Sequence, residues 1–325
     1  MAAVTVRTIA STERDAVLDL LAGWLDDRAF FARYFHHDPS FRDDLCFVGE
    51  IDGRLISTLQ VFRKRVRVAG AVLEVAALGN VYTDPAVRAA GTASALLERA
   101  IAAMPAHGFD VSLLFASKLD FYARFGWRTA LRNLTFIEPA PRPAPLPSGC
   151  ATFDAARDLA EVGAVYDAYN AAIAGATARD AAYWRGQLRY AGNPDERFLV
   201  ARRDGRIVAY ARAATLYDFN FVIEHGCVAG GEEALADLVA HQIDLAGSLP
   251  GTLAQVDPDA ALSSGLTARG LVLRAVDDPS AMWRLVDAQR LASKLRLPVA
   301  CVQSETFFSD LFPPAASRYW VSDRF

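Results

Sequence analysis

Apolar residues follow two different spacings along the first 138 residues. Runs rich in apolar and β-branched residues predict strands at residues 4–9, 44–50, 54–67, 71–83 and 128–137. Apolar residues at helical spacing predict helices that begin near Ser11, near Trp24 and, after Asp84-Pro85, near Ala93. This part of the chain is therefore predicted to be a mostly antiparallel sheet flanked by helices, with the strand at residues 128–137 closing it.

A proline-rich segment interrupts this pattern at residues 139–149. Prolines alternate there with small and basic residues and are followed by Ser148-Gly149. Proline is excluded from helix interiors and central strands, so the segment should be a stiff, extended connector. We expect it to separate a domain at residues 1–138 from a second one at residues 150–286.

The pattern of the first half returns after the connector. Residues 198–210 align without gaps on residues 46–58, with Asp-Gly-Arg at the same place in each. Helices predicted at residues 155–172 and 179–190 precede this stretch, and alternating strands and helices follow it up to a strand at residues 281–286. Such internal similarity indicates a duplicated fold. The predicted class is α/β (α+β), with two similar domains in tandem, each a mixed, mostly antiparallel sheet flanked by helices, and a short tail at residues 287–325.

Composition excludes several classes of function. Hydrophobic residues make up 53% of the chain and charged residues 22%, which excludes a disordered protein. The net charge of -4 provides no bulk attraction to nucleic acid, so we expect no nucleic-acid partner. No apolar run is long enough to span a bilayer and the N-terminus lacks a signal-peptide pattern, so we expect a cytoplasmic protein with no membrane partner. The four cysteines lack metal-ligand spacing, and His36-His37 lack a third ligand, so we expect no metal.

The turn before the helix near Ala93 carries the first chemical signal. Its residues are small after Arg88, and Gly91 lies at its centre. Small side chains let a ligand approach the backbone, and the free amides of a helix N-terminus favour a phosphate group. Arg88 can add a charge-assisted contact. A purely structural turn between a strand and a helix can have the same composition, so this segment alone does not decide the function.

A second motif follows the short apolar strand near residues 113–116. It reads Phe121-Tyr-Ala-Arg-Phe-Gly-Trp127. The two segments together resemble the signature motifs of the GNAT acyl-CoA-dependent N-acyltransferases, in which an Arg-x-x-Gly-x-Gly/Ala loop holds the coenzyme A pyrophosphate. The resemblance implies acetyl-CoA as cosubstrate and Tyr122 as the acid that protonates the departing thiolate. A phenol with a pKa near 10 is protonated at neutral pH and can donate this proton. The alternative is that Tyr122 only packs beneath the sheet.

The resemblance also assigns residues to the cosubstrate. The backbone at the end of the strand before the turn should hydrogen-bond the pantetheine arm, the turn should surround the pyrophosphate, and a later loop should line the far side. The implied residues are Val81, Tyr82, Thr83, Arg88, Ala89, Ala90, Gly91, Thr92, Ala93, Ser94, Ser117 and Lys118. The amine would attack the acetyl carbonyl directly, since no Cys or Ser lies in a nucleophile setting.

The first two helices flank the acceptor in GNAT folds. The residues that this resemblance assigns to the amine acceptor are Trp24, Asp26, Phe31 and Tyr34. The alternative is that the aromatic side chains belong to the core and the aspartate is solvated.

The second copy has lost both motifs. Ala229-Gly230-Gly231 replaces the Arg88 loop, and Thr267 stands where the first copy has Tyr122. We therefore expect the second copy to be a non-catalytic scaffold that shapes one wall of the acceptor site.

The tail is aromatic up to Phe325, which favours its docking near the active site. A tandem pair with such a tail resembles the Eis-type (enhanced intracellular survival) acetyltransferases, and this implies that the Phe325 carboxylate is catalytic, as a general base. The chain departs from that type, because residues 287–325 replace a full sterol-carrier-like domain. A tail that only seals the two domains is the alternative, and a homo-oligomer is left open.

The sequence thus predicts an acetyl-CoA-dependent N-acetyltransferase that acts on a primary amine of a small-molecule or protein acceptor. A Fem-type aminoacyl transferase shares the doubled fold but would need neither the Arg88 loop nor Tyr122. A non-catalytic acyl-CoA-binding or regulatory protein would keep the loop and could dispense with the tyrosine. The presence of both motifs favours the enzyme, while the acceptor and the length of the acyl chain stay open.

Overall fold

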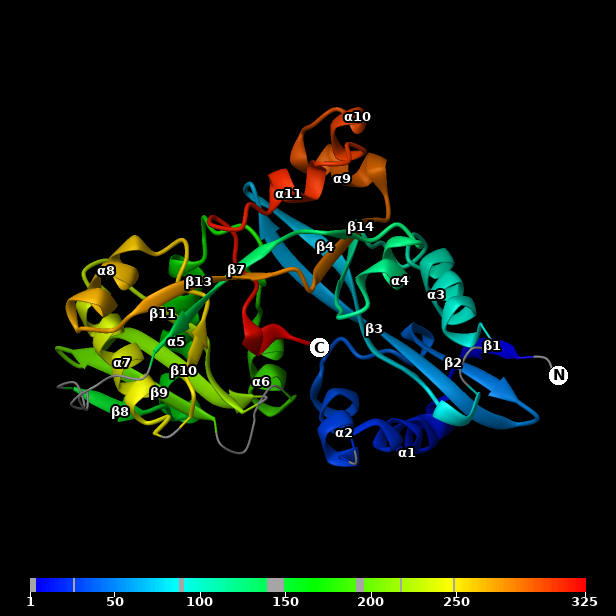
Figure 1. The fold of residues 1–325 in the computed structure, drawn as a ribbon, viewed down its shortest axis with the longest axis horizontal. Helices are drawn as coiled ribbons and strands as arrows, with labels where there is room; N and C mark the ends of the chain where they lie inside the picture. The colour runs from blue at the N-terminus through cyan, green and yellow to red at the C-terminus, as the bar shows by residue number, and fades with distance from the viewer. Residues whose placement is uncertain are drawn as a thin grey trace.

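Two seven-stranded sheets lie next to each other, each flanked by helices (Figure 1). The computed structural model describes residues 4–25, 27–87, 91–138, 149–190, 196–216, 218–247 and 249–325. The predicted fold class is confirmed, since the structure has two mixed, mostly antiparallel sheets, each flanked by helices. Among the described residues, no helix is long and apolar enough to cross a membrane.

The first sheet carries the two motifs singled out in the sequence. Its strands, in order across the sheet, are β1 (Thr5–Thr8), β2 (Cys46–Ile51), β3 (Arg54–Val68), β4 (Ala71–Thr83), β5 (Val111–Phe115), β14 (Ala281–Leu285) and β6 (Arg128–Thr129). Its helices are α1 (Arg14–Leu25), α2 (Arg28–His37), α3 (Thr92–Ala103) and α4 (Leu119–Ala123). Helix α3 packs on the sheet because Leu96, Leu97 and Ala100 are fully buried on one of its faces. Each such leucine contributes roughly 2 kcal/mol from burial.

The second sheet repeats this plan. Its strands, in order, are β13 (Leu273–Asp278), β7 (Arg132–Ile137), β12 (Thr252–Ala254), β11 (Phe219–Cys227), β10 (Arg206–Leu216), β9 (Arg197–Arg203) and β8 (Cys150–Thr152). Its helices are α5 (Ala155–Tyr169), α6 (Ala181–Tyr190), α7 (Glu232–Asp244) and α8 (Ala260–Ala268).

The two sheets exchange a strand. Strand β7 pairs with β12 and β13 in the second sheet, and β14 pairs with β5 and β6 in the first. The expectation that residues 128–137 close the first sheet holds only for Arg128–Thr129 of β6, because residues 132–137 join the second sheet. The assignment of residues 281–286 to the second copy's sheet is wrong. The alternating pattern of each strand suits either core, so the sequence could not distinguish the two sheets. The predicted domain boundaries stay predictions, because strands from both halves of the chain build each sheet.

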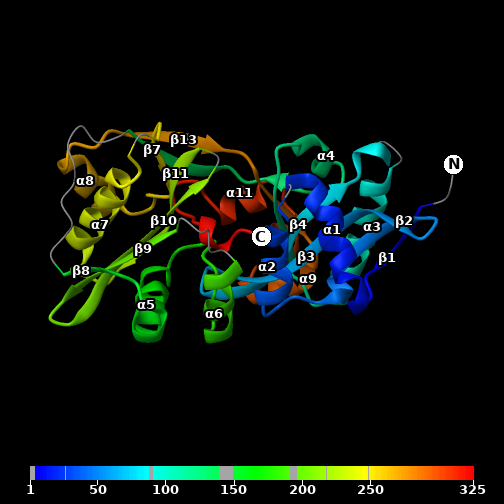
Figure 2. The ribbon, with the colours of Figure 1, turned by 90° about the horizontal axis from the view of Figure 1, so that it is seen from below.

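Helix α6 also joins the two halves. It packs against the C-terminal end of α2 (Figure 2), where a Cβ on Gly186 would lie only 2.3 Å from the His37 carbonyl oxygen. Beside α6, the Ala178 amide donates to the carbonyl oxygen of Arg65 on β3 at 2.7 Å. The second half is therefore bound directly to α2 and β3 of the first.

The tail covers the face of the first sheet opposite α3. Its helices are α9 (Ala288–Leu295), α10 (Val299–Val302) and α11 (Phe307–Leu311). Phe312 stacks on Trp283 of β14 with ring centres 4.2 Å apart. From α11 the chain returns to the junction between the sheets, where the C label lies in Figure 1.

Candidate active site

Strands β4 and β5 run parallel and pair over only part of their length. Their pairing extends from Val75 opposite Val111 to Leu78 opposite Leu114, whereas β4 continues to Thr83. The backbone of β4 beyond Leu78 is therefore not paired to β5. An added strand-like ligand can hydrogen-bond at such a place.

A bulge lies where this pairing stops. The register between β3 and β4 shifts after Thr58, and Asn80 has a positive φ of 51°. Asn80 is buried and donates from its side-chain amide to Gln60 Oε1 at 2.8 Å. A bulge redirects the backbone groups of its strand. The apolar run at residues 71–83 predicts an uninterrupted strand, although Gly79-Asn80 within it is a signal for a bulge.

Helix α3 begins at an open N-terminus. Gly91 precedes its first residue with a φ of 78°, and a Cβ placed on it would meet nothing within 4 Å. No described side chain caps the helix, so the amides of its first turn, which include those of Ala93 and Ser94, are available. Arg88, Ala89 and Ala90 lie outside the described residues.

Thr92 differs from its neighbours in this turn. Its side chain is buried, and its hydroxyl has no hydrogen-bond partner among the described residues. Its methyl group lies against β2, 2.7 Å from the position of a Cβ on Gly49. Only the backbone of Thr92 can therefore serve a ligand at this turn.

Tyr122 lies on α4, half-buried against the same core as α3. Its ring packs on Phe121 and Trp127 with centres 5.0 and 6.3 Å away. Val81 of β4 belongs to the same cluster, so the two predicted site residues share one core. Burial raises the pKa of Tyr122 above its ordinary value of 10.0. Ser117 and Lys118 are exposed in the loop that precedes α4.

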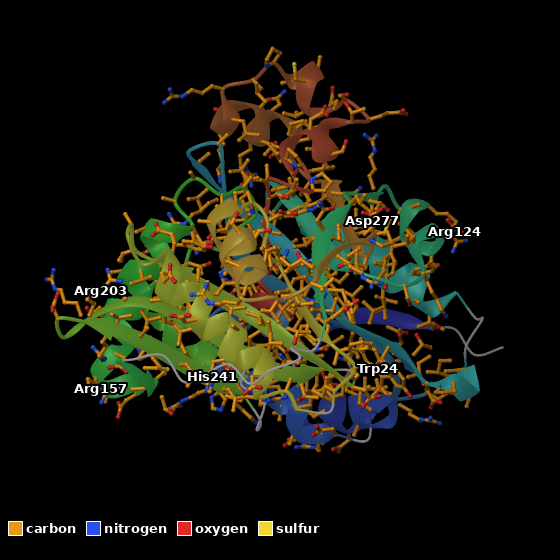
Figure 3. All side chains as sticks on the ribbon, turned by 60° about the vertical axis from the view of Figure 1, so that its left-hand side comes forward. Trp24, Arg124, Arg157, Arg203, His241 and Asp277 are labelled. Carbon is orange, nitrogen blue, oxygen red and sulfur yellow. The ribbon has the colours of Figure 1, made fainter. Side chains whose placement is uncertain are left out.

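The aromatic residues predicted to bind the acceptor form two groups. Trp24 stacks on Phe31 and on Tyr82 of β4, with ring centres 5.9 and 6.2 Å away. Tyr34 packs edge-on against Phe62 of β3 at 5.4 Å. Phe31 and Tyr34 are buried, whereas 49% of Trp24 is exposed at the surface (Figure 3). Asp26 lies outside the described residues.

Phe325 extends the second aromatic group to β4 and β5. Its ring lies 5.8 Å from Phe62 and 5.7 Å from Phe115 at the end of β5. A Cβ on Gly79 would lie 3.1 Å from the backbone oxygen of Phe325. The end of the tail therefore lies directly on β4 at the bulge.

In the second half, the turn before α7 corresponds to the turn before α3, and side chains from the first turn of α7 occupy it. The Gly230 amide donates to Glu232 Oε1 at 3.1 Å, and Glu232 and Glu233 both lie in the first turn of α7. Two carboxylates at this position oppose a phosphate group. Thr267, at the place of the lost tyrosine, donates its hydroxyl to the Ser263 carbonyl oxygen at 3.0 Å.

A surface cavity lies away from these motifs. It has a volume of about 560 Å³ and lies between α5 and the β9–β10 hairpin, lined in part by Glu161, Arg203 and Arg206. None of the predicted site residues lines it. Among the described residues, no group of three His, Cys, Asp or Glu side chains could hold a metal ion.

An interrupted parallel strand pair, an open helix N-terminus and a half-buried tyrosine thus lie together on the first sheet. Residues 5–130 match the family model described as an acetyltransferase (GNAT) domain. None of the curated proteins matches the chain.

Solved structures share the fold over most of the chain. One is a conserved protein of unknown function from Enterococcus faecalis, a probable N-acyltransferase, with 17% identity, a TM-score of 0.68 and coverage of 90% of this chain and 75% of that one. A GCN5-related N-acetyltransferase from Kribbella flavida has 16% identity, a TM-score of 0.64 and coverage of 88% and 72%. Eis1 from Mycobacterium abscessus has 21% identity, a TM-score of 0.61 and coverage of 90% and 76%. These similarities establish a shared fold.

Proposed function

We propose that this protein is an acyltransferase that moves the acetyl group of acetyl-CoA to a primary amine. The observation that carries the proposal is the clustering of Tyr122 and the unpaired end of β4 on one core beneath α3. The open N-terminus of α3 supports it, because Gly91 leaves space for an anion beside free amides.

Each part of the site has one role in this proposal. Val81, Tyr82 and Thr83 offer backbone groups to the pantetheine arm, and the turn from Arg88 to Ser94 holds the pyrophosphate, with Ser117 and Lys118 on the far side. Tyr122 donates its phenolic proton to the sulfur as the carbon–sulfur bond breaks. The amine attacks the acetyl carbon directly, so catalysis comes mainly from proximity.

The acceptor is proposed to approach from the side of α1 and α2. Trp24 is the exposed member of the stack with Phe31 and Tyr82, so it offers an aromatic face to an ammonium group. Phe325 lies on the same side of β4, and a free carboxyl group there would hold the ammonium group and accept its proton. The acceptor itself is proposed to be a small molecule or a protein, and the protein to act in the cytoplasm.

Titration of acetyl-CoA by calorimetry tests the proposal before an acceptor is known. We expect about one site per chain, with affinity at least about tenfold lower in Gly91→Glu, since the new carboxylate repels the pyrophosphate. Gly230→Glu is a matched control, because Gly230 also precedes a helix with positive φ and open space around its Cβ. A folded wild-type protein that binds no acetyl-CoA would overturn the proposal and favour an aminoacyl transferase or a scaffold.

A further inference from the structure

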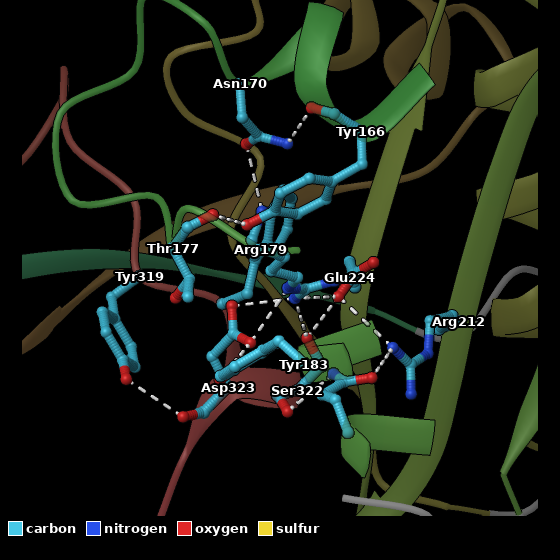
Figure 4. A network of polar contacts seen from close by, with 12 residues as sticks. Tyr166, Asn170, Thr177, Arg179, Tyr183, Arg212, Glu224, Tyr319, Ser322 and Asp323 are labelled. Carbon is cyan, nitrogen blue, oxygen red and sulfur yellow. Dashed lines mark hydrogen bonds and ion pairs between the residues drawn. The ribbon is translucent and has the colours of Figure 1, made fainter. Parts of the chain in front are cut away.

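A buried ionic cluster joins the second sheet to the end of the tail (Figure 4). Arg179, which precedes α6, donates to Glu224 Oε2 of β11 at 2.6 Å and to Asp323 Oδ2 at 2.8 Å. All three side chains are fully buried. The tail residue Ser322 adds hydrogen bonds to both Arg179 and Glu224.

The cluster continues into the first sheet. Tyr183 of α6 donates to Asp323 Oδ1 at 3.0 Å, and Lys64 of β3 donates to the Tyr183 oxygen at 3.2 Å. Lys64 in turn lies 3.5 Å from Asp38, which follows α2. One series of polar contacts therefore connects β11, α6, the tail, β3 and the end of α2.

Most of the partners that fix Asp323 come from the second half of the chain. Arg179 and Tyr183 hold its carboxylate, and Gln187 of α6 donates to the neighbouring Ser322 carbonyl oxygen at 2.9 Å. Two residues further on, the ring of Phe325 packs on Phe62 and Phe115 of the first sheet and on Tyr319 of the tail. The position of Phe325 on β4 thus depends on where the second half holds Asp323.

The ionic character of this anchor makes it selective. Burying charged groups costs more than burying apolar ones unless each charge is paired, and loss of one partner leaves the others uncompensated. Arg179 can pair with Glu224 and Asp323 at the same time in only one position of the tail. A hydrophobic contact would not specify a single position in this way. The tail is therefore held in one register on β4.

We infer that Arg179 and Tyr183 are positioning residues of the active site, which hold Asp323 so that Phe325 stays on Gly79 and shapes the acceptor side. This inference rests on the proposed function. The second half has lost its own motifs, and it acts on the reaction through the tail rather than through a chemical group of its own.

Hydrogen exchange measured by mass spectrometry tests the anchoring without any acceptor. In Asp323→Asn, Arg179 keeps its pair with Glu224, so the fold should persist while amide exchange over residues 319–325 accelerates about tenfold or more. Tyr183→Phe, which removes only the hydroxyl, should accelerate it less. Asp158→Asn is the control, because Asp158 is an equally buried carboxylate that pairs with Arg202 in the second half without contacting the tail. Unchanged exchange in Asp323→Asn would overturn the anchoring.

Steady-state kinetics test the effect on the site. We expect Asp323→Asn to lower kcat roughly tenfold with the KM for acetyl-CoA changed less than about twofold, while Asp158→Asn changes neither despite a similar loss of thermal stability. A released tail with unchanged kcat would overturn the positioning role. Failure of the proposed function can be distinguished from failure of the positioning role, because in the first case the wild-type protein itself binds no acetyl-CoA. That result would overturn the positioning role as well.

Discussion

Tyr122 has the environment that a proton donor at neutral pH requires. Its ring is half-buried on Trp127, and burial raises its pKa above 10.0, so the phenol is protonated at every pH at which the enzyme would work. Among the described residues, no neighbouring charge lowers this pKa.

Replacing Tyr122 with Phe should remove the acid without disturbing the packing. We expect kcat to fall at least about tenfold with acetyl-CoA affinity nearly unchanged. Tyr169→Phe provides the comparison, because Tyr169 is also half-buried with a raised pKa but lies in the second half. Equal kcat for Tyr122→Phe and wild type would remove the assigned role.

The carboxyl group of Glu224 makes the free energy of unfolding depend on pH in the acidic range. Burial alone would raise its pKa, but Arg179 and Arg212, with the hydrogen bonds from Arg179 and Ser322, lower it from an ordinary 4.5 to about 2. Because the pKa of Glu224 is lower in the folded state than in the unfolded state, its ionised form stabilises the fold fully at pH values above 4.5. This stabilisation is lost as the pH falls from 4.5 toward the folded-state pKa of about 2. This contributes on the order of 3 kcal/mol.

The free energy of unfolding should therefore decrease more steeply in the wild type than in Glu224→Gln as the pH falls from about 5 to about 3. Urea unfolding at several pH values measures it. Other paired carboxylates, such as Glu13 and Asp158, titrate equally in both proteins, so the difference isolates Glu224. Parallel curves would show that Glu224 is not responsible.

Site residues whose role depends on the local backbone could be predicted from the sequence, whereas residues whose role depends on partners far away in the chain could not. Gly91 was predicted because the turn and the helix that need it are its neighbours in the chain. Thr92 was predicted at the same turn, but the contact of its methyl group with Gly49 depends on a strand far away in sequence. Arg179 and Asp323 are 144 residues apart, and each resembles an ordinary surface charge until the fold pairs them.

The elements themselves were largely readable from local pattern. Strand β4 was predicted at residues 71–83, as the structure has it, because its apolar run is bounded by Ala69-Gly70 and by Asp84-Pro85. Its bulge was missed because a bulge depends on the partner strand. The neighbours of β7 and β14 were misassigned for the same reason, since strand pairing is a tertiary choice.

Helices α2 and α6 approach each other closely at Gly186. A Cβ on Gly186 would lie 2.3 Å from the His37 carbonyl oxygen and 2.8 Å from Pro39 Cδ, so Gly186→Ala should push the helices apart. We expect it to destabilise the fold by roughly 1–3 kcal/mol, although alanine favours a helix. Thermal unfolding measures the change.

Gly163→Ala on α5 is the matched control. The nearest atom to a Cβ there is Trp184 Nε1 at 3.5 Å, an ordinary contact, so the better helix propensity of alanine should keep or raise the melting temperature. If both variants melt like the wild type, the α2–α6 contact is less tight than the structure indicates.

The whole molecule is held together by the exchanged strands. Each sheet is completed by one strand from the other half, β14 in the first and β7 in the second. A single cooperative transition should therefore be seen by calorimetry for the full chain. Residues 1–138 expressed alone should show no cooperative urea transition, because β5 lacks β14 and β7 lacks its sheet. A cooperative transition of that fragment would contradict this interdependence.

The exchange also sets an order of events during synthesis. A chain that leaves the ribosome N-terminus first exposes the open edge of β5 as soon as residues 111–115 emerge. Its partner at residues 281–285 emerges only after nearly the whole second sheet has been made. The half that carries the candidate active site is thus begun first and completed late, and a product of translation that stops before residue 281 lacks the strand that completes the first sheet.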